Sequence, residues 1–314
     1  MPTSIFITTR CTLFGRWWTG QLCWRKLSQD VNDPEAWALA YSVCAATGAP
    51  LRLDTAFGST SRPGNYSIID RFALEAERSR AKVDYKENAT VHCILIPFFL
   101  HMYYSSTRRH FTATLLLREA LTLCELLDLD KESMDGTLDV EEQKFRRKVF
   151  WLLFVTERGN AMQYDSAAVL RNTISLPDPE DDQDPVVFAA FLSLVHLFVS
   201  VDGTLVGSGA HVGQIPSTKL FSQLQQRLRD GPKIPPHSSE VQKTDICVTQ
   251  QWYVWVFLKP KDGSSKWSQD ANVGLAAGNE ERQYGSRLFR GSALTHISFP
   301  CCQRFVSIVV ECLT

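Results

Sequence analysis

Histidine and cysteine side chains are common ligands of transition metals, so their spacing is the first test for chemistry in this 314-residue chain. His92 and His101 are nine residues apart, a poor match to one helix face, and no H-E-x-x-H pattern occurs. None of the nine cysteines forms a C-x-x-C pair, and Cys11 and Cys23 have no second pair nearby. We therefore expect no metal ligands, and free thiols in a reducing, intracellular compartment. The histidines on or beside apolar segments are predicted to be core or surface residues: His92, His101, His110 and His196.

A second kind of chemistry would need a phosphate-binding loop or an activated nucleophile. Gly207, Gly209 and Gly213 form a glycine-rich stretch, but it follows an apolar helix rather than a strand and lacks a Gly-Lys-Ser/Thr triplet. No G-x-S-x-G sequence is present. We therefore predict a flexible loop at the glycines, no catalytic residues, no cofactor-binding residues, and a protein that is not an enzyme.

Two charged groups leave their interpretation open. Glu157 and Arg158 follow an apolar run, where a buried ion pair could fix helix packing or touch a ligand. An acidic run precedes a predicted helix and could attract a metal or a basic partner, or could be a solvated loop at the helix N-terminus. That run consists of Glu180, Asp181, Asp182 and Asp184.

The charge of the chain argues against a nucleic-acid-binding protein that acts alone. The formal net charge is −1 and the sequence pI is about 6.7, so there is no basic field over the whole chain. One local cluster is basic, but Glu141 and Glu142 adjoin it. Its members are Lys144, Arg146, Arg147 and Lys148. We expect no sequence-specific DNA binding by the isolated chain.

The elements that would position these residues are helices. Apolar residues recur at helical spacing, strand signals are few, and the class is predicted to be all-α. The apolar segment at 88–104 is too short to span a bilayer, and Pro97 should kink it. Helices are predicted at about 33–47, 67–83, 88–104, 111–129, 140–163, 186–201, 217–229 and 239–258.

The helix at about 140–163 is expected to be the central one. It begins with charged residues, but Val149–Val155 is apolar on every face. A helix that is apolar all round is buried all round. We therefore predict a multi-helix domain at 33–258 built around this helix, an atypical N-terminal segment at 1–32, and an irregular C-terminal tail at 259–314.

Two segments carry a resemblance to a known family. They are "TATLLLREALTLCELLDLDKE" and "DVEEQKFRRKVFWLLFVTERGNAMQYDSAAVLRNTISLPDP", at 112–132 and 139–179. A leucine-rich helix, an aspartate-rich turn, an "E-x-x-x-R-R-x-V-F-W" helix and an asparagine-containing loop ending in Leu-Pro follow in that order. This order resembles the fungal-specific transcription factor domain, the middle region of regulators with a six-cysteine binuclear zinc cluster. "FWLLFVTERG-AMQ" looks most like activators of sugar utilisation and some secondary-metabolite regulators.

The resemblance implies an all-α regulatory domain in a nuclear transcription regulator of sugar utilisation or of a secondary-metabolite gene cluster. It also implies a possible small-molecule effector. The family's zinc cluster has cysteines in C-x2-C-x6-C spacing, whereas residues 1–29 hold only Cys11 and Cys23. We expect a truncated regulatory domain, either a short natural form or an altered gene model, that lacks its own DNA-binding module. It would act through a protein partner such as a full-length zinc-cluster regulator, with no membrane association. The alternative is a helical small-molecule-binding protein or a minor enzyme of a biosynthetic pathway.

Overall fold

The computed structural model describes residues 30–49, 67–132, 138–164 and 166–178, with short runs and single positions between 185 and 199. These residues form helices and connections without any strand, so the prediction of an all-α class is confirmed. The described residues fall into two compact units. The first holds 30–49, 67–132, 138–157, 169–178 and 185, and the second holds 158–164, 166–168 and the positions from 188 to 199. The tail at 259–314 and the helices predicted at 217–229 and 239–258 lie outside the described residues.

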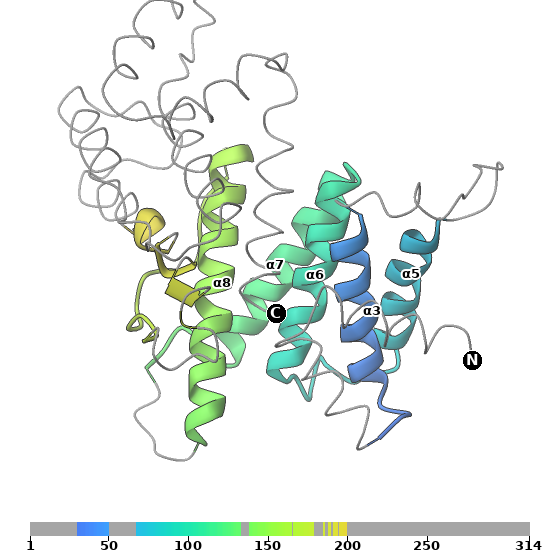
Figure 1. The fold of residues 1–314 in the computed structure, drawn as a ribbon, viewed down its shortest axis with the longest axis horizontal. Helices are drawn as coiled ribbons and strands as arrows, with labels where there is room; N and C mark the ends of the chain where they lie inside the picture. Colours follow the sequence, from blue (N-terminus) through green and yellow to red (C-terminus); the bar gives the residue numbers. More distant parts are fainter. Residues whose placement is uncertain are drawn as a thin grey trace, which may run out of the picture. The chain divides into compact units, whose positions relative to one another are not determined.

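The helices of the first unit begin where the sequence places side-chain caps. Asp33 accepts hydrogen bonds from the Glu35 and Ala36 N–H groups and begins α3 (Pro34–Gly48), with Pro34 at its first position. Ser67 caps α5 (Ile68–Arg80) in the same way. The order continues with α6 (Val91–Ser106), α7 (His110–Leu126) and α8 (Val140–Tyr164), and α6 lies between α3 and α7 (Figure 1).

Helix α6 (Val91–Ser106) is an almost wholly buried helix. Thr90 caps it, so it begins later than the predicted residue 88. Pro97 lies inside it and does not end it, although a proline cannot donate a backbone hydrogen bond to the preceding turn. Two tyrosines of α6 find hydrogen-bond partners on α5. The Tyr104 hydroxyl donates to Glu77 of α5 at 2.6 Å, and the Tyr103 hydroxyl donates to Asp70 of α5.

Helix α7 (His110–Leu126) has the apolar stripe that its spacing predicts. The side that faces the core includes Ala113, Leu116, Ala120 and Leu123. The opposite side of α7 also has large apolar residues, which the sequence spacing did not predict to be exposed. Phe111 is 91% exposed, and Leu115 and Leu126 are each 71% exposed.

The turns at the C-terminal ends of α6 and α7 share one geometry. Arg108 (φ 63°) and Asp128 (φ 56°) adopt the left-handed conformation that glycine usually supplies. In each turn the following residue donates to a carbonyl five residues back, Arg109 N–H to Tyr104 and Leu129 N–H to Cys124. Both helices therefore end in a Schellman motif without glycine.

Helix α8 (Val140–Tyr164) contains the predicted apolar run. Every side chain from Val149 to Val155 is at most 1% exposed, so the prediction of burial on all faces is confirmed. The indole N–H of Trp151, the largest of these side chains, donates to the Ser175 carbonyl at 3.0 Å. No helix among the described residues has both the length and the apolar character needed to cross a membrane.

Trp151→Ala should lower the free energy of unfolding by about 3–5 kcal/mol, because it leaves a cavity around a fully buried position and removes an indole hydrogen bond. Chemical denaturation followed by far-UV circular dichroism measures this. Phe111→Ala is the matched control, since that ring is exposed, and it should change the free energy by no more than about 0.5 kcal/mol. Equal effects of the two substitutions would contradict the buried position of Trp151.

His101 should make the fold sensitive to mild acid. Burial lowers the pKa of its imidazole from 6.5 to about 4, and Nδ1 lies 2.8 Å from the Ala113 carbonyl, which accepts its hydrogen. Because the folded-state pKa is the lower one, the unfolded chain binds more protons between these values. The contribution of neutral His101 to the free energy of unfolding is therefore fully present above about pH 6.5. It is lost as the pH falls towards 4, and the total loss is about 3 kcal/mol. His101→Asn keeps a donor without titrating, so denaturation from pH 7 to 4.5 should show a shallower loss of stability in the variant. Parallel curves would refute the assignment.

Candidate functional site

The basic side chains at the start of α8 are engaged by acidic groups and by a helix end. Arg146 Nε lies 3.1 Å from Glu142, and Arg146 Nη1 donates to the Leu127 carbonyl at 3.2 Å, where α7 ends. Arg147 pairs with Glu132 at 3.2 Å. The two arginines of the "E-x-x-x-R-R-x-V-F-W" pattern therefore join α8 to the segment that follows α7.

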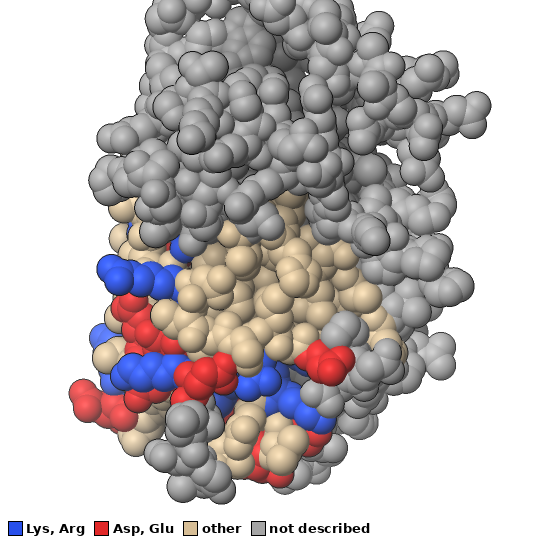
Figure 2. Space-filling view, turned by 90° about the vertical axis from the view of Figure 1, so that its left-hand side faces the viewer, with Lys and Arg blue, Asp and Glu red and all other residues tan. Residues whose placement is uncertain are grey.

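The two lysines of this cluster are also engaged or buried. Lys144 pairs with Glu141 at 3.2 Å, and Lys148 is buried. Figure 2 shows the side of the molecule on which α8 lies, and there the Lys and Arg side chains alternate with Asp and Glu. Charges of both signs at this spacing give no continuous positive surface on that face of the described residues.

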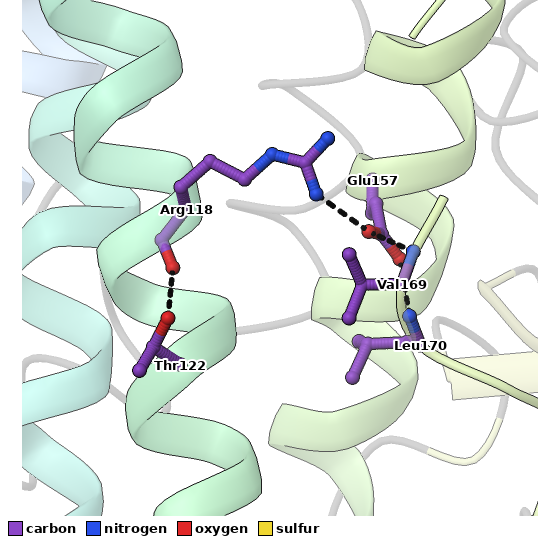
Figure 3. Close-up of polar contacts among 5 residues, drawn as sticks. All are labelled: Arg118, Thr122, Glu157, Val169 and Leu170. Atoms are coloured by element: carbon purple, nitrogen blue, oxygen red, sulfur yellow. Dashed lines mark hydrogen bonds and ion pairs between the residues drawn. The ribbon is translucent and has the colours of Figure 1, made fainter. Parts of the chain in front are cut away.

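Glu157 is the most deeply buried acidic side chain among the described residues. It lies on α8 just after the apolar run and is 2% exposed, whereas its partner Arg118 on α7 is 38% exposed, with 3.5 Å between Nη1 and Oε1. The Glu157 carboxylate also accepts hydrogen bonds from the Val169 N–H at 2.6 Å and the Leu170 N–H at 2.9 Å. Figure 3 shows Arg118 reaching across from α7 and the two backbone donors converging on the same carboxylate.

These contacts suit a structural role for Glu157. A buried carboxylate needs donors to replace its water, and here both oxygens have them. An acceptor engaged in this way is poorly placed to take a proton from a substrate. Of the two interpretations left open for Glu157, the contacts favour helix packing. Arg158 is buried and begins the second unit.

A second carboxylate holds the same backbone segment farther along. Glu132 accepts from the Ser175 N–H and pairs with Arg147. Its pKa is lowered by the hydrogen bonds from Ser175 and, to a smaller extent, by the Arg147 charge. Residues 166–178 include the asparagine-containing loop of the sequence pattern, so the pattern describes a helix together with the loop that returns along it.

The histidines of the sequence analysis have different surroundings in the described residues. The His92 ring lies 5.8 Å from the Phe145 ring, His101 is buried between α6 and α7, and His110 and His196 are exposed. Within the described ranges no group of three or more His, Cys, Asp or Glu side chains is placed to hold a metal ion. Cys11, Cys23, the glycines at 207–213 and the acidic run at 180–184 lie outside the described residues.

Two of the three described thiols, Cys93 and Cys124, have the character of core groups, whereas Cys44 is half-buried. Cys93 and Cys124 are buried and free, and burial raises the pKa of both thiols. The Cys93 thiol donates to Glu35 at 3.2 Å, next to the Thr90 hydroxyl, which donates to the same carboxylate. A thiol with a raised pKa is a weak nucleophile at neutral pH.

Three pairings could not be found from spacing alone, namely Arg118 with Glu157, Arg147 with Glu132 and Trp151 with Ser175. The members of each pair lie on different elements. The only signal in the sequence was indirect, because a carboxylate next to an all-apolar helix run must find donors somewhere.

Comparison with known proteins gives the chain its relatives. It is 28% identical over 226 residues to the "Probable sucrose utilization protein" SUC1 of Candida albicans, which covers 70% of this chain and 45% of that protein. It is 32% identical over 113 residues to the maltose fermentation regulatory protein MAL13 of Saccharomyces cerevisiae, covering 36% of this chain and 24% of that protein. The chain is homologous to fungal transcription regulators.

The resemblance seen in the sequence is thereby confirmed. A third relative, the respiratory transcription factor ZNF1 of Saccharomyces cerevisiae, is 30% identical over 121 residues, which is 38% of this chain and 26% of that protein. The chain spans less than half the length of these curated relatives. No family model and no solved structure matches it.

Glu157→Gln should lower the free energy of unfolding by about 2–4 kcal/mol, because the two backbone N–H groups bond to different carboxylate oxygens and the amide replaces one of these acceptors with an NH2 donor in a buried site. Arg118→Gln should cost less, about 1 kcal/mol, because the guanidinium is partly solvated. Urea denaturation measures both values. The double variant should cost less than the sum, since the two side chains share one interaction.

The matched control is Glu125→Gln, which removes an exposed carboxylate from α7 and should change the free energy of unfolding by no more than about 0.5 kcal/mol. If Glu157→Gln were as mild as this control, the carboxylate would not be holding the Val169–Leu170 backbone.

Proposed function

We propose that this chain is a transcription regulator of sugar utilisation, acting through an all-α regulatory domain at about 33–258. The observation that carries the proposal is the match to the Candida albicans sucrose utilization protein. A match covering 70% of the chain includes α8 wherever the match begins, so the helix and loop of the family pattern lie within the shared region. Of the two programmes that the resemblance implied, the names of the relatives favour sugar utilisation over secondary metabolism.

The role we propose is regulatory and nuclear rather than enzymatic. The relatives named above include regulators and a transcription factor, and the polar groups of the described core hold helices and loops together. A small-molecule effector, such as a sugar or a sugar-derived metabolite, would bias the conformation of such a domain if it bound one state more tightly than another.

We further propose that the chain reaches promoters through a protein partner, for which a full-length zinc-cluster regulator is suited. Specific reading of DNA needs side chains on base edges as well as phosphate contacts. The basic residues of α8 are paired with Glu141, Glu142 and Glu132 or are buried, and the net charge of −1 gives little long-range attraction to phosphate.

Fused to a heterologous DNA-binding domain in yeast, the chain should change transcription of a reporter, and the change should differ between glucose and maltose or sucrose media. The DNA-binding domain alone is the control.

Without the fusion, the purified chain should show no preference for a promoter duplex over a scrambled one at physiological salt, with or without zinc. A reporter that responds identically to all three sugars would contradict the sugar-related role, and submicromolar binding to one duplex would contradict the need for a partner.

A further inference from the structure

Residues 169–178, here called the strap, are attached to the first unit mainly by side chains. The strap has no regular secondary structure, and four of its backbone groups bond to side chains of other elements. The Val169 and Leu170 N–H groups bond to Glu157, the Ser175 N–H bonds to Glu132, and the Ser175 carbonyl accepts from Trp151. The strap therefore runs back along α8, from Glu157 towards its N-terminal half.

The two carboxylates that bind the strap each form an ion pair with the other helix. Glu157 lies on α8 and pairs with Arg118 of α7, whereas Glu132 follows α7 and pairs with Arg147 of α8. Both carboxylates therefore contact an arginine of a helix as well as the strap backbone. One further contact, from the Thr173 hydroxyl to the Asp130 carbonyl at 2.5 Å, holds the middle of the strap.

The strap buries a smaller share of its side chains than α6 or the apolar run of α8 does. Leu170, Ile174 and Pro177 are buried, but most of the other strap residues are exposed, Val169 and Thr173 among them. Segments with few buried apolar contacts and exposed backbone open at a lower free energy than the helices they cover. Leaving α8 would take the Ser175 carbonyl away from the Trp151 indole N–H.

We propose that the strap is a detachable cover of α8, which opens while α3, α5, α6 and α7 stay folded, and that this opening is the switch of the regulatory domain. The switching role rests on the proposed function, but the opening does not. The closed state is the one in which Glu157 and Glu132 hold the strap backbone. In the open state the Trp151 indole N–H is released from the Ser175 carbonyl.

Native-state hydrogen exchange of the full chain tests the opening. In the wild type the amides of Val169, Leu170 and Ser175 should exchange at least about tenfold faster than the amides of α6, and their rates should depend little on low concentrations of urea. Glu157→Gln should speed the strap amides by about ten- to hundredfold, because the charged acceptor is lost. Glu132→Gln should act in the same direction and more weakly, since that carboxylate is more exposed.

The matched control is Glu119→Gln, which removes the α7 carboxylate paired with Arg80 of α5. That pair stays intact when the strap opens, so the control should speed exchange in α6 and leave the strap amides unchanged. If strap and α6 amides exchange at one rate in the wild type, and the control speeds both, the strap opens only by global unfolding and the proposal is wrong. Strap amides without any protection in the wild type would equally refute it.

The reporter fusion tests the switch. Glu157→Gln and Glu132→Gln should alter the sugar response, whereas Glu119→Gln should not. If the strap opens selectively but the sugar response does not change, the switching role is refuted and the proposal that the strap is a detachable cover still holds. If the wild-type fusion gave no response to any sugar, the proposed function and the switching role would both fall, while hydrogen exchange would still decide whether the strap opens.

Discussion

The burial of the Val149–Val155 run of α8 on all its faces is the constraint on which the rest of the structure depends. From Val149 to Val155 the helix has no side that water can reach, so every face needs cover. Trp151 adds a polar requirement, because a buried indole N–H without a partner would cost free energy comparable to a lost hydrogen bond. The Ser175 carbonyl meets that requirement and so determines where the chain after α8 must pass.

Covering α8 with a loop creates a second requirement, because a loop has backbone groups that no helix or sheet satisfies. The strap meets it by taking carboxylates as acceptors, Glu157 at one end and Glu132 at the other. Each carboxylate then needs a positive partner, and the arginines of α7 and α8 supply it. Arg147 of the "E-x-x-x-R-R" pattern is one of these partners, whereas Arg146 contacts Glu142 and the end of α7.

Much of the fold could be predicted because its signals are local. Asp33, Pro34 and Ser67 mark helix starts through contacts within three residues, and the apolar run of α8 indicates its own burial. Helix ends were less certain. The helix predicted to reach residue 83 ends at Arg80, because 81–83 form a turn that donates to the carbonyls of the last helical residues. The start of α6 was predicted near 88, but Thr90 is its cap. Several nearby polar residues could cap a helix, so the sequence did not single out Thr90.

For the candidate site, the sequence predicted that Glu157 needs partners but not which residues they are. A glutamate beside an apolar run must be paired, but its partners Arg118 and Val169 lie on other elements, and their approach depends on how α7 and the strap pack. The basic residues of α8 raise the same difficulty. Arg146 and Arg147 are charged in any reading, yet only the fold shows that the end of α7 and Glu132 engage them. Because these charges hold the helices and the strap, any surface that meets a partner has to come from other residues or from a change in what is covered. That dependence connects the packing of α8 to the regulatory role proposed for the chain.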